Sequence, residues 1–446
     1  MTALALRSLR HRLPAAVATL AAVLLGTALM ASFATLAQSA GGAHDDDREL
    51  LIIMGAVVGG WGSLIVLFSV ASTVGIVAEQ RIGEAGLLRT IGATPRQVRA
   101  LIVYEATAVT LLAAAAGAGV AVFGGRALFD AVQRGGLIST ASAYNGGPAS
   151  LAAAAGVVVL VSVVAAVISS RRATRGPAAF SLRQTDVPAR RLPWWRALTG
   201  VVLVGSGAAA AVVTVTVTGK SDDPYAAMQT SGSAAIVAGV GLAALAPVLL
   251  RMPARALRPL LARSSGGYLA AENTTRRAHL FAAMLAPVIV FVSTAVGTLL
   301  MVGIDGRTRN AASDPEGVGD TITTINAVVI GMICLFAAIM VVNAAVAAVV
   351  HRRAELDRLW RLGATRGQLR AAVVLEAAVV TAVGIVFGLL GSTATAVPYA
   401  IVRHEGVLPD GQLWLVPAVA AVAAALAVAA AWGAHRRPGR WKTLRP

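Results

Sequence analysis

The chain has 446 residues, of which 57% are hydrophobic and 13% charged, and its excess of basic residues gives a formal net charge of +17. About a quarter of the residues of a soluble globular protein are charged, so this composition excludes an ordinary soluble protein. The single cysteine, Cys334, excludes an intrachain disulfide and a thiolate metal cluster, and the six histidines lack the spacing of a metal site.

Apolar segments of about 20 residues, enough to cross a bilayer core, recur along the whole chain. They predict an all-α polytopic membrane protein with ten transmembrane helices. We expect these spans at about 13–37, 51–78, 101–124, 150–169, 197–218, 232–250, 280–303, 323–350, 371–395 and 413–432.

The charges of the connecting segments predict the orientation. The two ends of the chain and the loops 79–100, 170–196, 251–279 and 351–370 hold 31 of the 38 lysines and arginines. Because basic loops stay on the cytoplasmic side, we expect both termini in the cytoplasm and the chain in the plasma membrane. Trp194, Trp195, Trp414 and Trp432 fall at predicted membrane–water interfaces, where tryptophan is enriched.

A polar segment occurs twice. "EAGLLRTIGATPRQVRALIVYEA" runs from Glu84 to Ala106, and "ELDRLWRLGATRGQLRAAVVLEA" runs from Glu355 to Ala377. An ungapped alignment of 81–106 with 352–377 has 12 identities in 26 positions, which indicates an internal duplication. We expect spans 1–4 (residues 1–196) and 7–10 (261–446) to be two parallel repeats, joined by linking spans 5 and 6 (197–260). Six spans separate the copies, so both have the same orientation.

Each copy predicts a bent helix. Gly92 and Gly363 suit the left-handed residue that ends a helix, and Thr94 and Thr365 suit the N-cap of the next helix. The glutamine three residues after each threonine completes a capping box. We therefore expect a cytoplasmic helix, a break at Gly-Ala, and a second helix that enters the membrane.

Apolar and charged side chains line the first helix of each bend. Leu88 and Ile91, or Leu359 and Leu362, share one face, and a preceding glutamate and arginine are close enough to pair. This pattern favours docking on a partner; the alternative is a helix corner that lies on lipid headgroups. The predicted partner-binding residues are Arg81, Glu84, Leu88, Ile91, Gly92, Ala93, Thr94, Gln97, Arg99, Arg352, Glu355, Leu359, Leu362, Gly363, Ala364, Thr365, Gln368 and Arg370.

Three polar residues fall within predicted spans. Glu105 and Glu376 occupy equivalent positions near the cytoplasmic start of a span, where an interfacial anchor satisfied by an arginine competes with a transport role. We expect Asn343 to make an interhelix hydrogen bond. No catalytic residues are expected. "TGKS" (218–221) is no P-loop, because the motif requires glycine at position 214, which is threonine.

The repeated pattern R-x-x-E-x-x-x-L-x-x-x-G-A-T-x-x-Q-x-R, at Arg81–Arg99 and Arg352–Arg370, resembles the FtsX-like permease family of ABC transporter membrane subunits. That family includes MacB, LolC/E and bacitracin-exporter permease types. The resemblance implies FtsX-like domains at about 51–172 and 323–437. It also implies that the two bends are coupling helices that seat on a dimer of ATP-binding subunits. ATP and Mg²⁺ would bind in that partner, and this chain would hold no cofactor and hydrolyse nothing.

The chain departs from the family in its external loops. Residues 38–50 and 304–322 are short connections where family members carry large extracellular domains. We therefore expect a hydrophobic or amphipathic substrate that enters from the bilayer. The alternative is a sensing scaffold that works with an ATPase and a histidine kinase without transport. A stand-alone secondary transporter is disfavoured, because it would need paired charges at the midplane and the spans are nearly charge-free.

Overall fold

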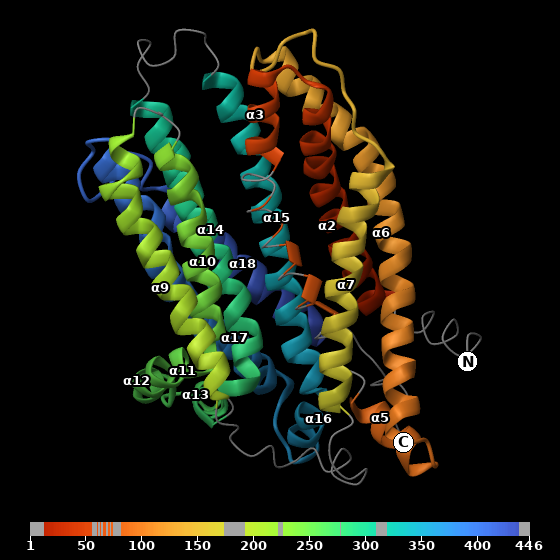
Figure 1. Cartoon of the computed structure of the whole chain (residues 1–446). Coiled ribbons are helices and arrows are strands. Elements are labelled where there is room, and N and C mark those ends of the chain that lie inside the picture. The colour runs from red at the N-terminus through yellow and green to blue at the C-terminus, as the bar shows by residue number, and fades with distance from the viewer. Residues whose placement is uncertain are drawn as a thin grey trace. The chain divides into compact units, whose positions relative to one another are not determined.

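The computed structural model describes residues 13–55, scattered positions between 60 and 74, and residues 82–173, 192–221, 226–276, 278–308 and 319–436. Apart from short 3₁₀ turns and a π turn at the end of α3, the regular structure of this part is α-helical, which confirms the predicted all-α class (Figure 1). The helices are α2 (Leu13–Ser39), α3 (Asp45–Ile53), α5 (Ile82–Thr90), α6 (Pro95–Arg134), α7 (Pro148–Ala173), α9 (Trp194–Thr216), α10 (Ala226–Ala244), α11 (Ala246–Leu249), α12 (Arg251–Leu261), α13 (Ser265–Arg276), α14 (Ala278–Thr308), α15 (Gly319–His351), α16 (Arg353–Arg361), α17 (Arg366–Val402) and α18 (Leu415–Arg436).

Among the described residues, eight helices are long and apolar enough to cross a membrane, so the chain is a polytopic membrane protein. They lie in α2, α6, α7, α9, α10, α14, α17 and α18, at eight of the ten predicted spans. The eighth predicted span falls in α15, a helix of 33 residues, within which the described stretch Ala337–Val349 is apolar but shorter than a full span. The second, 51–78, lies largely outside the described residues.

The helices form two compact units. The first comprises Met1–Val187 and Asn310–Ile339, and in it α2, α6 and α7 pack side by side (Figure 1). The second comprises Pro188–Arg309 and Met340–Pro446. Its α14 packs against α10, α17 and α18 and is largely buried. The predicted linking helices α9 and α10 pack within this second unit, and the division of the chain at residues 196 and 260 stays a prediction.

The connection between α6 and α7 is tied to its own unit by hydrogen bonds. The carboxylate of Asp47 on α3 accepts from the Ser139 backbone N–H (3.0 Å) and from the Ser142 hydroxyl (2.6 Å). The Ser142 hydroxyl is the main reason that the pKa of Asp47 lies below its ordinary value. The Asn145 N–H donates to the hydroxyl of Ser39, at the end of α2 (3.1 Å). These contacts fix the connection against the ends of α2 and α3.

The segment 251–279, expected as a loop, contains two helices. The helix α12 packs against α13, and α13 packs against α17. Figure 1 shows α11, α12 and α13 at the end of the second unit where α9 begins and α10 ends.

Candidate coupling site

The first bend joins α5 to α6 through a left-handed glycine. Gly92 has φ +104°, a conformation that a side chain would disfavour. The Ala93 N–H donates to the Leu88 carbonyl (2.9 Å), and the Gly92 N–H donates to the Arg89 carbonyl (3.2 Å). These are the two hydrogen bonds of a Schellman motif, which satisfies the last carbonyls of α5 and stops it.

The second bend, between α16 and α17, repeats this geometry. Gly363 has φ +101°. The Ala364 N–H donates to the Leu359 carbonyl and the Gly363 N–H to the Trp360 carbonyl, both at 3.0 Å. The predicted helix break is therefore confirmed in both copies, at equivalent residues and with equivalent bonds.

Each helix that follows a bend begins with a capping box. The Thr94 N–H donates to Gln97 Oε1 (2.9 Å), and the Gln97 N–H donates to Thr94 Oγ1 (3.3 Å). Thr365 and Gln368 make the same pair of bonds, at 2.9 and 3.2 Å. Both predicted caps are confirmed. A cap of this kind contributes about 1 kcal/mol to the stability of its helix.

The apolar side chains of the first bend face in two directions. Leu88 is half-buried and packs with Ala93 against Val98 and Ile102 of α6, so it holds the two arms of the bend together. Ile91 lies at the tip, and 76% of its surface is exposed. The sequence predicts that Leu88 and Ile91 form one apolar ridge, but Leu88 makes an internal contact and only Ile91 is exposed at the tip.

The two leucines of the second bend differ in exposure in the same way. Leu359 is half-buried, and Leu362, the counterpart of Ile91, is 83% exposed. Leu356 of α16 is 5% exposed and fixes this helix to its own unit. Sequence comparison missed Leu356 because the first copy has alanine there. The most exposed apolar side chain of each bend is therefore the one at its tip, Ile91 or Leu362.

A buried ionic cluster anchors the second bend. Arg352 lies between α15 and α16, is 8% exposed, and donates to Glu355 of α16 (3.2 Å) and to Glu376 of α17. The other oxygen of Glu376 accepts from Asn273 of α13 (2.8 Å). The guanidinium also lies over the Phe281 ring, 5.4 Å from its centroid. The predicted arginine–glutamate pair is confirmed in this copy, and an arginine also satisfies Glu376.

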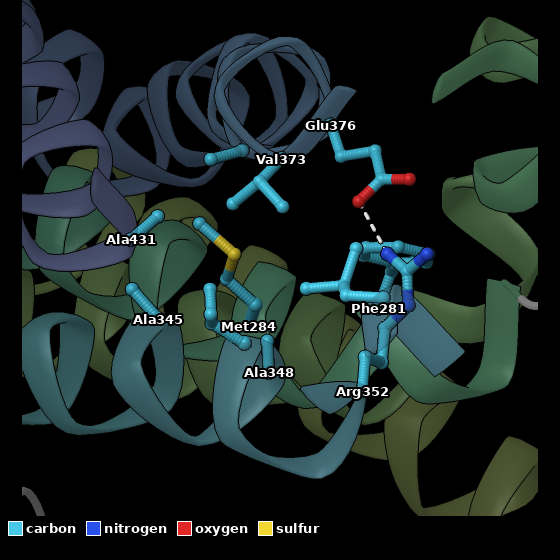
Figure 2. Close-up of a pocket in the computed structure, with 11 residues that line it drawn as sticks. Phe281, Met284, Ala345, Ala348, Arg352, Val373, Glu376 and Ala431 are labelled. Carbon is cyan, nitrogen blue, oxygen red and sulfur yellow. Dashed lines mark hydrogen bonds and ion pairs between the residues drawn. The ribbon is translucent and has the colours of Figure 1, made fainter. Parts of the chain in front are cut away.

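Figure 2 shows the residues that line the small cavity beside this cluster, with the hydrogen-bonded Arg352 and Glu376 together on one side of it. Its volume of about 10 Å³ accommodates no more than one water molecule. Apolar side chains, including Met284 and Ala431, line the rest. The cluster is thus enclosed by packing, which favours a structural connection between helices over a substrate pocket.

Comparison with protein families places the two bends in matched regions. The model described as FtsX-like permease C-terminal matches residues 56–178 and 327–438, which together exceed half of the chain, and each region contains one bend. The chain belongs to the FtsX-like permease family. A comparison with curated proteins found no match.

The family gives the chain its general role. FtsX-like permeases are the membrane subunits of ABC transporters, they are generally not catalytic themselves, and they normally pair with an ATP-binding subunit. This protein is therefore an ABC transporter permease subunit.

The remaining predicted residues of this permease differ in burial and in position. Glu105, the counterpart of Glu376, is buried at 5% exposure on α6. Arg81 and the side chain of Glu84 lie outside the described residues. The Nδ2 of Asn343 is buried and has no hydrogen-bond partner among the described residues, and the expected interhelix bond stays a prediction. Arg99 is half-buried and Arg370 is exposed, each within the first two turns of its helix.

Proposed function

We propose that this permease couples ATP hydrolysis by a separate homodimer of ATP-binding subunits to the export or extraction of a hydrophobic or amphipathic substrate. Each ATP-binding subunit would seat on one bend, α5–α6 or α16–α17. ATP and Mg²⁺ would stay in the partner, and the bends would lie in the cytoplasm.

The identical geometry of the two bends carries this proposal. Both contain a left-handed glycine, a Schellman motif and a capping box, and both end in an exposed apolar side chain, Ile91 or Leu362. A partner with two equal subunits presents two equal surfaces, which suits two equal docking elements. An exposed isoleucine or leucine at the tip of a bend gains free energy when a partner buries it in an apolar pocket.

The ionic cluster supports transmission of movement from the second bend. Arg352 bonds to α16 through Glu355 and to α17 through Glu376, and Glu376 in turn bonds to α13. Because these side chains are largely buried, their separation would be costly. A displacement of α16 by a partner would therefore move α17 with it.

The substrate class rests on the short connections 38–50 and 304–322, which leave no room for a large external receptor domain. A substrate that reaches the permease from the bilayer needs no such domain. The sensing alternative shares the same docking bends, so only a measurement of transport separates the two functions.

The test is co-expression of the permease with the ATP-binding subunit encoded nearest to it. Ile91→Asp and Leu362→Asp should each raise the dissociation constant of the complex about tenfold or more, because a buried isoleucine or leucine contributes about 1.5–3 kcal/mol. Stimulation of ATP hydrolysis by the permease should fall accordingly. The matched control is Leu408→Asp, an exposed leucine (70%) in the connection between α17 and α18, which should change neither quantity.

Two results would contradict the proposal. If both tip variants insert in the membrane and bind the ATP-binding subunit as tightly as the wild type, the bends are not its docking elements. If the reconstituted pair hydrolyses ATP but moves only small hydrophilic solutes, the substrate class is wrong. A histidine kinase that co-purifies with a pair that transports nothing would favour the sensing function.

A further inference from the structure

The helix α12, with the sequence "RMPARALRPLL", has three distinct faces. Ala254 is fully buried on the face that packs against α13. Met252 and Leu260, which are 77% and 58% exposed, lie on a second, apolar face eight residues apart. Arg251 and Arg255 lie four residues apart on a third face. An exposed apolar face beside a basic face is typical of a helix that lies in a membrane interface.

The neighbouring helices place α12 at the level of such an interface. Trp194 and Trp195, at the start of α9, are 77% and 52% exposed, as expected of interfacial tryptophans. The adjacent Arg196 donates through Nε to the carbonyl of Ala244, the last residue of α10 (3.0 Å). The membrane boundary marked by these tryptophans therefore passes the end of α10, and α12 begins seven residues later.

The basic face of α12 carries two arginines that form no ion pair with the described residues. Among the described residues, Arg251 and Arg255 have no carboxylate partner, whereas Arg258 pairs with Glu272 of α13 (3.2 Å) and so helps to hold α12 in place. Two arginines that can bind an anion thus lie beside an exposed methionine and leucine, at the level of the bilayer surface.

We infer that α12 is an interfacial helix that binds anionic phospholipids, with Met252 and Leu260 among the acyl chains and Arg251 and Arg255 on the headgroup phosphates. A protein partner would have to cover an apolar face at the level of the tryptophans, where lipid is already present. The inference goes beyond coupling to an ATP-binding subunit and does not depend on it.

The experiment uses the full-length permease with Cys334→Ser and a fluorescent label on Met252→Cys, reconstituted without any partner. Phosphatidylglycerol or phosphatidylcholine with a nitroxide on the acyl chain serves as the quencher. We expect both lipids to quench the label. Quenching by labelled phosphatidylglycerol should exceed quenching by labelled phosphatidylcholine about fivefold or more, because one arginine near an anionic surface raises the affinity for that surface by about this factor.

The controls separate immersion from headgroup binding. A label on Val202→Cys, an exposed position (58%) within the transmembrane helix α9, should be quenched equally by both lipids. Arg251→Gln with Arg255→Gln should bring the preference at residue 252 close to parity while quenching persists. No quenching at residue 252 beside normal quenching at residue 202 would overturn the inference. Equal quenching at residue 252 by phosphatidylglycerol and phosphatidylcholine would also overturn it. A label at residue 252 that becomes shielded from water only when an ATP-binding subunit is added would overturn it as well.

Discussion

Replacement of Glu376 by glutamine tests the ionic cluster directly. The side chain of Glu376 is 3% exposed and that of its partner Arg352 is 9% exposed, so the variant leaves a buried guanidinium without its main counter-charge. Removal of one partner of a buried pair costs about 3–5 kcal/mol. Glu355 stays within 3.2 Å of Arg352 and compensates in part, which places the expected cost near the lower limit, about 3 kcal/mol.

The assay is the melting temperature of the purified permease in detergent. For a unit of about 150–250 residues, 1 kcal/mol corresponds to about 2–4 °C, so Glu376→Gln should lower the melting temperature by about 6–12 °C. The double variant Arg352→Met with Glu376→Met removes both charges and fills similar volume, and should be more stable than Glu376→Gln.

Two outcomes would refute the reasoning. A melting temperature of Glu376→Gln within about 1 °C of the wild type would show that the pair contributes little. A double variant whose loss equals the sum of the single losses of Arg352→Met and Glu376→Met would show that the two side chains do not interact, because coupled residues give non-additive changes.

Two further predictions concern local features. Gly363→Ala should destabilise the second bend by about 1–2 kcal/mol, because alanine is strained at φ +101°. The matched control is Gly205→Ala on α9, where open space surrounds the added methyl group. Equal melting temperatures of these two variants would contradict the prediction. Arg307 donates to both oxygens of Glu405 and lowers the pKa of that carboxyl. The stabilisation is therefore present above the ordinary glutamate pKa of about 4.3 and is lost as the pH falls below it. Arg307→Gln should lower the melting temperature by about 2 °C at pH 7, and this difference should shrink as the pH falls below about 4.3. A difference that stays constant with pH would contradict the prediction.

The bends could be predicted to the level of single hydrogen bonds because their causes are local. A left-handed glycine, a threonine two residues later and a glutamine three residues after that fix the backbone within six positions. The sequence does not show whether Leu88 packs inside the bend or faces outward. Leu88 and Ile91 are both large apolar residues, and nothing in the repeated segment tells which of them makes an internal contact. That distinction depends on Val98 and Ile102, on the other arm of the bend.

The ionic cluster shows where sequence reasoning reaches its limit. The sequence predicts an arginine partner for Glu376, but Asn273 and Phe281 reach the cluster from α13 and α14 through tertiary packing, which the sequence does not show. Residues 251–279 are predicted as a loop because hydropathy averaged over the length of a membrane span hides a helix of 11 residues such as α12. Arginines at 251, 255 and 258 repeat with helical spacing, and this signal would have revealed it.

The unbroken length of α6 has a mechanical consequence. Its 40 residues make a rod about 60 Å long that starts at the capping box of the first bend and ends at Arg134, where the connection fixed by Ser139 and Ser142 begins. Tilting such a rod by about 10° about one end shifts the other by about 10 Å. A displacement of the first bend would thus reach the opposite end of α6 without any intermediate joint.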